Sequence, residues 1–138
     1  MRIRWSLGFI LAMTVPIAVV SAILYGFFGR MNLINHHDLA VGEVYGYTRG
    51  VKGGPNACTV KYRYTAEGKA YERTTLFRPP VLTCEDCQAR LVGRTFPIVY
   101  EKGHAGNSTI LLSPSAFRIY SYSFPDSLKW VQEFVHEK

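Results

Sequence analysis

The chain has 138 residues, 48% of them hydrophobic, and carries 16 basic against 10 acidic side chains, a formal charge of +6. Three of its arginines, Arg2, Arg4 and Arg30, flank one long apolar run, which leaves 13 basic against 10 acidic residues elsewhere. This small excess excludes the strongly basic surface of a nucleic-acid-binding domain, so we expect no nucleic-acid partner. The length allows one small domain beside a membrane segment.

The first element in chain order is an uncharged run of 25 residues, Trp5 to Gly29. At about 1.5 Å per helical residue it covers roughly 37 Å, enough to cross a hydrocarbon core of about 30 Å. It predicts a transmembrane anchor over residues 1–30. The alternative is a signal peptide cleaved after Val20 to Ala22, but the run continues through Phe28. That length exceeds the usual signal-peptide core of about 7–15 residues.

The charges on either side of the run predict its orientation. Arg2 and Arg4 precede it, whereas Arg30 is the only lysine or arginine between the run and Thr48. Because basic residues are enriched on the cytoplasmic side of membranes, we expect a cytoplasmic N-terminus. The domain is then periplasmic or extracellular, or lumenal in a eukaryotic cell.

Small residues form a stripe within the run. Ala18, Ala22 and Gly26 are spaced four apart and therefore lie on one helix face, and Pro16 predicts a kink near the middle. The stripe predicts a helix-packing surface through which the chain forms a homo-oligomer. The alternative is that the stripe reflects only the frequency of small residues in membrane helices.

After a polar linker, residues 31–38, the pattern predicts strands in a domain of residues 39–138. A first strand is expected over 40–48, and a hairpin pairs residues 58–65 with 69–77. A two-residue turn at Glu67-Gly68 sets its register, which places Tyr64 opposite Tyr71 and Cys58 opposite Phe77. The tyrosine face is expected to point to the core.

Two further strands and a helix complete the predicted domain. Residues 95–100 predict an edge strand because Pro97 cannot donate to a ladder, residues 101–107 a turn, and residues 108–112 the next strand. The class is mainly β, a small antiparallel barrel or curled sheet of five to six strands.

The last segment predicts an amphipathic helix over residues 127–137, with Ser123 and Asp126 as a capping box. It is expected to pack against the sheet. Trp130 and Phe134 are a candidate partner surface, or alternatively lie in a lipid interface.

Three cysteines, Cys58, Cys84 and Cys87, are the candidates for chemistry. The hairpin register places Cys58 beside Phe77, and a chain that turns at Pro79-Pro80 returns Cys84 or Cys87 to Cys58. We expect a disulfide from Cys58 to one of them, stabilising the fold by about 2–4 kcal/mol. A disulfide between Cys84 and Cys87, with Cys58 a buried free thiol, is the main alternative.

Redox and zinc chemistry are the other interpretations of these cysteines. A redox dithiol needs a lowered thiol pKa, and the charges of Glu85 and Asp86 are expected to raise it instead. A zinc site needs a fourth ligand, for which His104, or His36 and His37, are candidates. We expect no resident metal, no cofactor and no catalytic residue, since the sequence places no carboxylate or nucleophile near a histidine.

The pattern from Ala40 to Leu112 resembles a family of uncharacterised bacterial membrane proteins. The resemblance lies in these residues: Val60-Lys61-Tyr62-Arg63-Tyr64 with Gly68 and Tyr71, then Gly93 through Phe96-Pro97-Ile98-Val99-Tyr100, then Ser108 with Ile110-Leu111-Leu112. It implies a membrane helix that carries a small β domain, and it implies no reaction.

Two function classes follow from these observations. The first is a non-catalytic, membrane-anchored envelope protein whose outer domain binds a protein or an envelope component, including an immunity-type protein that neutralises a toxin. The second is a thiol-redox or zinc-binding protein that uses Cys58, Cys84 and Cys87. We favour the first.

Overall fold

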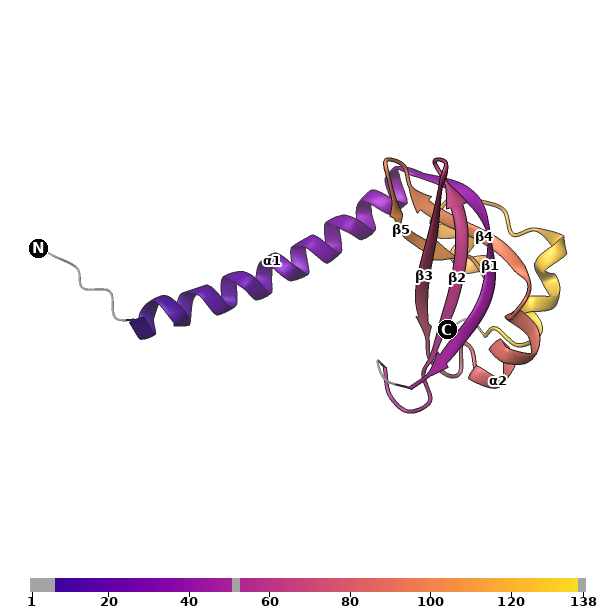
Figure 1. Cartoon of the computed structure of the whole chain (residues 1–138), viewed down its shortest axis with the longest axis horizontal. Coiled ribbons are helices and arrows are strands. Elements are labelled where there is room, and N and C mark those ends of the chain that lie inside the picture. Colours follow the sequence, from indigo (N-terminus) through magenta and orange to yellow (C-terminus); the bar gives the residue numbers. More distant parts are fainter. Residues whose placement is uncertain (1–6, 51–52, 137–138) are drawn as a thin grey trace, which may run out of the picture. The chain divides into compact units, whose positions relative to one another are not determined.

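The computed structural model describes residues 7–50 and 53–136, with side chains from Pro16 onward. The chain divides into two compact units between Asn32 and Leu33. The first is most of helix α1, Leu7–Asn35, and the second is a β domain with short helices (Figure 1).

Helix α1 is long and apolar enough to cross a membrane. Its described apolar side chains face outward, including Ile23 at 66% exposed, Tyr25 at 79% and Phe27 at 60%. Pro16 lies inside the helix, as expected. Within the described part of the chain, these residues are therefore left uncovered.

The expected linker at residues 31–38 is not a loop. Helix α1 continues to Asn35 and strand β1, His37–Arg49, begins two residues later, so His36 alone separates them. Leu33 is only 5% exposed and belongs to the core of the domain. The His37 imidazole holds the junction, with Nδ1 2.8 Å from the Ile34 carbonyl oxygen and Nε2 3.1 Å from that of Tyr120. The polar residues that suggested a linker end the helix instead.

Five antiparallel strands form a nearly closed, barrel-like sheet in the order β3-β2-β1-β4-β5. The fold class is therefore confirmed. The strands after β1 are β2 (Cys58–Ala66), β3 (Lys69–Phe77), β4 (Thr95–Glu101) and β5 (His104–Ile110). The sheet curls until β3 and β5 are neighbours, although no ladder pairs them among the described residues (Figure 1).

The hairpin register predicted from the turn is confirmed at each pair. Tyr64 lies opposite Tyr71 and Cys58 opposite Phe77. Glu67 and Gly68 have φ angles of +49° and +73°, which is the type I′ turn that matches the twist of the flanking strands. The inward face of β2 is buried, with Tyr62 0% and Tyr64 4% exposed.

Strand β4 is not an edge strand, because β1 pairs with one side of it and β5 with the other. The Pro97 carbonyl accepts a hydrogen bond from Leu111 N at 3.0 Å, just past the end of β5. The N and O atoms of one strand residue point to the same side, so the missing donor of Pro97 faces the place where β5 has ended. The proline therefore interrupts no central ladder.

Strand β5 begins four residues earlier than expected, since the turn is only Lys102-Gly103. The register with β4 shifts between the pairs Tyr100–Ser108 and Glu101–His104, so residues 105–107 of β5 are inserted between these two pairs, and Asn107 Nδ2 donates to Glu101 Oε2 at 2.8 Å. These residues form a bulge. The carbonyl groups of Ala105 and Gly106 accept hydrogen bonds from Tyr64 and Arg73 across the barrel.

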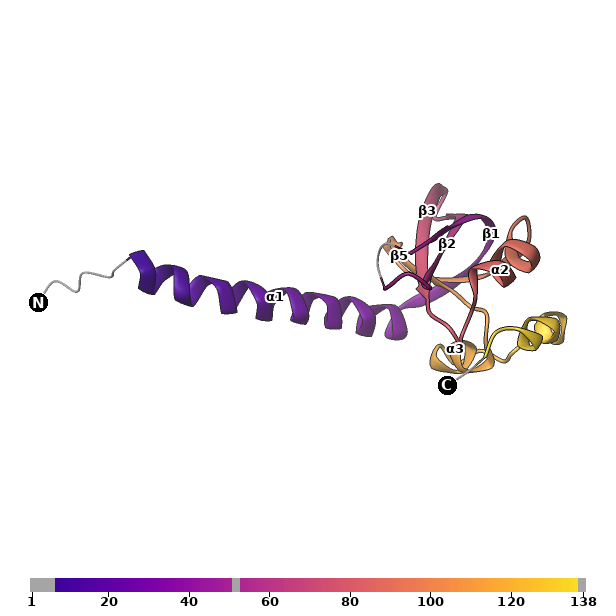
Figure 2. The ribbon, with the colours of Figure 1, turned by 90° about the horizontal axis from the view of Figure 1, so that it is seen from below.

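Short helices close the domain: α2 (Cys84–Asp86), the π-helical turn η1 (Cys87–Leu91), α3 (Pro114–Ile119) and the 3₁₀ helix η2 (Asp126–Glu133). Figure 2 shows α3 and the C-terminal segment together on one side of the sheet. The C-terminal helix is thus shorter than expected, and the capping box is wrong: Pro125 precedes η2 and no side chain caps it.

Candidate functional site: a buried thiol cluster

The three cysteines come from two neighbouring parts of the domain. Cys58 is the first residue of β2, Cys84 begins α2, and Cys87 begins η1. All three are free thiols and buried, with exposed fractions of 0%, 3% and 0% respectively. They belong to the core rather than to the surface.

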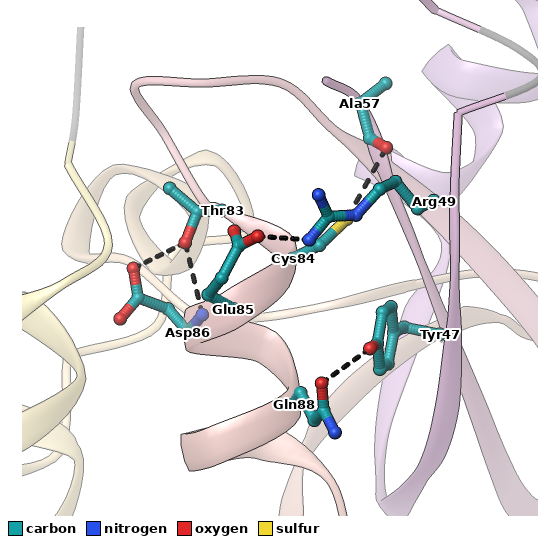
Figure 3. A network of polar contacts seen from close by, with 8 residues as sticks. All are labelled: Tyr47, Arg49, Ala57, Thr83, Cys84, Glu85, Asp86 and Gln88. Carbon is teal, nitrogen blue, oxygen red and sulfur yellow. Dashed lines mark hydrogen bonds and ion pairs between the residues drawn. The ribbon is translucent and has the colours of Figure 1, made fainter. Parts of the chain in front are cut away.

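Thr83 fixes where α2 begins. Its Oγ1 accepts a hydrogen bond from Asp86 N at 3.1 Å and donates one to Asp86 Oδ2 at 2.7 Å (Figure 3). An N-cap of this kind satisfies an otherwise unpaired amide of the first turn. The cap turns Cys84 toward the sheet, where its thiol donates to the Ala57 carbonyl at 3.6 Å.

The thiols meet one another in this position. The thiols of Cys84 and Cys87 both lie near enough to Cys58 to raise the pKa of its thiol. The prediction that Cys84 or Cys87 returns to Cys58 is therefore correct in placement. The disulfide itself is absent, because the structure contains the reduced form of all three cysteines.

Burial makes the thiols of Cys58 and Cys87 weaker acids. Desolvation is the main cause that raises the pKa of Cys58, followed by the neighbouring Cys84 thiol, and desolvation raises the pKa of Cys87 to about 11. The cause differs from the expected repulsion by Glu85 and Asp86, since neither carboxylate contributes. A thiol of this kind stays protonated near neutral pH and is a poor nucleophile.

An ion pair covers the nearest surface. Arg49 at the end of β1 pairs with Glu85 of α2, and Tyr47 Oη donates to Gln88 Oε1 at 2.7 Å (Figure 3). The pKa of Glu85 is lowered by a backbone hydrogen bond and then by Arg49. Both side chains are exposed, so the pair adds little stability. It ties α2 to β1 above the thiols.

A cavity of about 150 Å³ lies under this pair, and Cys84 is the one cysteine that lines it. Arg49, Thr83 and Glu85 form its polar walls. The volume is below the 300–1,000 Å³ of typical small-molecule sites, so it admits a few waters rather than a substrate.

The histidines considered as zinc ligands lie elsewhere. His37 begins β1, whereas Cys58 pairs with Arg49 at the far end of that strand. His104 begins β5 and lines a different groove. In the described ranges 7–50 and 53–136, no group of three or more histidine, cysteine or acidic residues is arranged to hold a metal ion.

The other predicted surfaces have different outcomes. Ala18, Ala22 and Gly26 are exposed on α1, and a Cβ at Gly26 would meet no atom within 4 Å, so the stripe is open. Phe134 is only 4% exposed and is a core residue rather than a partner surface. Trp130 is half-buried, with its ring 5.8 Å from that of Phe134 and the Arg94 guanidinium 4.5 Å above it.

Sequence reasoning missed how the barrel closes. Tyr62 Oη donates to the Ser108 carbonyl at 3.2 Å, Tyr64 Oη donates to the Ala105 carbonyl, and Arg73 Nε donates to the Gly106 carbonyl at 2.5 Å. Ala105 and Gly106 belong to the bulged part of β5, and Ser108 follows it in the regular ladder with β4. The glycine at position 106 was the one sign in the sequence of this close approach, because a Cβ there would lie 2.4 Å from Arg73 Nη2.

Comparisons with family models, curated proteins and solved structures find no match for the chain.

Proposed function

We propose that this protein is a single-pass, membrane-anchored binding module whose β domain binds a protein or an envelope component and catalyses no reaction. One observation carries the proposal: α1 exposes its apolar and aromatic side chains along its described length, which water would disfavour and lipid would satisfy. The thiols of Cys58 and Cys87 support the second half, since burial and a raised pKa make them poor nucleophiles.

The proposed orientation is a cytoplasmic N-terminus with the domain periplasmic or extracellular. Its support is the excess of arginines before the apolar run. The open stripe of Ala18, Ala22 and Gly26 supports a homo-oligomer formed through α1. The resemblance to uncharacterised membrane proteins agrees with an anchored β domain and stays a prediction.

We propose the edge of β3 away from β2 as the binding face, because β5 is its neighbour there but shares no ladder with it among the described residues. In a hairpin with a two-residue turn, the residues beside the turn form a hydrogen-bonded pair and the pattern then alternates. Ala70, Glu72, Thr74 and Leu76 therefore direct their backbone groups away from β2. The Glu72 carbonyl fits this pattern, since it accepts a hydrogen bond from the Arg73 side chain, at Nη1, at 2.8 Å. An exposed edge of this kind accepts an extended segment of a partner as a further strand.

The test uses a photo-crosslinking residue at Glu72 in the full chain, in intact cells. We expect one adduct of defined mass, lost in Thr74→Pro, which removes the outward N–H and leaves the β2 ladder intact. Thr74→Val keeps that N–H and should keep the adduct. Thermal unfolding of both variants verifies folding. An adduct unaffected by Thr74→Pro would contradict strand addition, and no adduct in the unsubstituted background would contradict binding at this edge.

A disulfide is proposed within the thiol cluster, in an oxidising compartment. Cys58 and either Cys84 or Cys87 lose two protons and two electrons to the oxidised disulfide of a thiol oxidoreductase, and an S–S bond forms. The convergence of the three thiols supports it and equally supports the alternative Cys84–Cys87 bridge. Alkylation of denatured protein without reductant, followed by peptide mapping, identifies the bridge. Three alkylated cysteines would contradict both versions.

The second function, a redox or zinc protein, has the same convergence of three thiols as its only support. The raised pKa of Cys87 argues against a redox nucleophile.

A further inference from the structure

A groove of about 360 Å³ opens along the seam of the barrel, between β3 and β5, which are neighbours but share no ladder among the described residues. Lys69, Tyr71 and Arg73 of β3 line one side, and His104 to Gly106 of β5 line the other. Lys69, Arg73 and His104 are exposed on its walls. The groove is separate from the thiol cluster, which lies at the other end of β2 and β3.

The groove has a fixed side chain in it. The Arg73 guanidinium donates from Nε to the Gly106 carbonyl and lies 5.7 Å from the Tyr71 ring centroid. A Cβ at position 106 would be 2.4 Å from Nη2, so a larger residue there would displace the end of the Arg73 side chain. Arg73 is thus held in one place with Nη2 beside the seam, which reduces the entropy that a bound anion must overcome.

The charges in the groove favour an anion. In the described part of the chain, Lys69, Arg73 and His104 form no ion pair within 4 Å, whereas Arg63, Lys102 and Lys129 each have a carboxylate partner. One carboxylate, Glu67, also lies on the rim. Its Oε1 accepts from Gly103 N at 2.7 Å, so this oxygen is already occupied in joining the two hairpin turns. Lys69 and Arg73 therefore outnumber the single acid.

The groove begins at the end of the barrel where the chain enters from α1. Lys102 N donates to the His36 carbonyl at 2.9 Å, and the Glu67–Gly103 bond places the second turn beside the first. His36 lies six positions after Arg30, which follows the uncharged run. At about 1.5 Å per helical residue this is about 9 Å, comparable to one headgroup layer.

We infer that this groove binds the phosphate of an anionic lipid headgroup, from the outer surface of the bilayer that holds α1. The inference rests on the proposed anchoring. Lys69 and Arg73 supply the charge, His104 a ring nitrogen, and the chain length keeps the groove within reach of the headgroups. A soluble phosphate ester offers the same chemistry, and the experiment separates the two sources.

The test is hydrogen–deuterium exchange of the full chain in nanodiscs of phosphatidylcholine, with and without phosphatidylglycerol. We expect the amides of residues 103–106 to exchange about threefold more slowly with phosphatidylglycerol, the slowing that occupancy of about two thirds produces. Lys69→Gln with His104→Gln should abolish the slowing. Lys61→Gln, which removes a lysine from the outer face of β2, should retain it. Arg73 is not substituted, because it closes the barrel.

Three results would overturn the inference: no slowing with phosphatidylglycerol, equal slowing in the double variant, or equal slowing when glycerol phosphate is added to phosphatidylcholine discs. The last would assign the groove to a soluble ester. Co-elution of the chain with the discs reports anchoring independently. A chain that fails to co-elute contradicts the proposed function, whereas a chain that co-elutes without slowing contradicts only the headgroup site.

Discussion

The thiol of Cys87 shows how burial determines what a residue can do. The sequence contains a pair of cysteines three apart, a spacing shared by redox motifs, zinc sites and ordinary cores. What separates these uses is exposure and the local field, and neither is visible in a spacing. The structure buries Cys87 completely and raises its pKa. The residue is therefore built for packing or for a stable bridge.

The reduced chain should lose stability at alkaline pH for this reason. Cys87 titrates near 9.0 when unfolded and about 11 when folded, so between these values the folded state binds more protons. The free energy of unfolding therefore falls as pH rises through this window, by about 2 kcal/mol from this thiol. Below pH 9 the contribution is fully present. Denaturant unfolding at a series of pH values, in reductant, measures it.

The matched control for the alkaline loss is Cys87→Ala. Tyrosines titrate in the same range in both proteins, so the difference between their pH profiles isolates the thiol. The variant should have a flatter profile above pH 9, and so should the oxidised chain if Cys87 is bridged. Identical slopes in reduced wild type and Cys87→Ala would show that burial of this thiol does not govern the alkaline loss.

The elements that local chemistry determines were predictable, and those that neighbours determine were not. The hairpin follows from Glu67-Gly68, because a two-residue turn and a period of two fix the register. Pro97 led to the wrong prediction of an edge strand. Its missing backbone N–H matters only where a neighbouring strand lies opposite, and β5 has ended at that position. The bulge at residues 105–107 escaped prediction since it depends on Tyr64 and Arg73 across the seam.

The junction of α1 and β1 was mispredicted for a related reason. Asn32 to Asp38 is polar in sequence, yet Leu33 faces the core and the last turn of α1 belongs to the domain. Composition reports an average over a segment, whereas one buried leucine decides where the chain is fixed. The candidate site follows the same rule: the convergence of three cysteines was predictable, and their complete burial was not.

Leu33→Ala should therefore destabilise the β domain. The side chain is 5% exposed among core residues, so its truncation should lower the free energy of unfolding by about 2–4 kcal/mol. Asn32→Ala, one position earlier and exposed, should change it by less than about 0.5 kcal/mol. Thermal unfolding of both full-length variants in detergent, followed by β-sheet circular dichroism, compares them. Equal effects would mean that the helix end is not part of the folded domain.

The whole molecule combines an apolar helix and a small closed sheet through a junction of one residue, His36. In the proposed anchored state, a short junction limits how far the domain can move from the bilayer, because His36 lies only six positions after Arg30. A domain anchored in this way would be suited to contact what lies at the membrane surface. The proposed partner edge of β3 and the seam groove are both on this tethered domain.

The most direct measurement of this account is labelling of reporter cysteines in intact cells with a membrane-impermeant maleimide. The native thiols are at most 3% exposed and should stay silent without denaturant, whereas Glu72→Cys places a thiol on the exposed face of β3. The account predicts that Glu72→Cys is labelled in intact cells and Arg2→Cys only after lysis, with both chains in the membrane fraction. The reverse pattern, or a chain recovered in the soluble fraction, would contradict it.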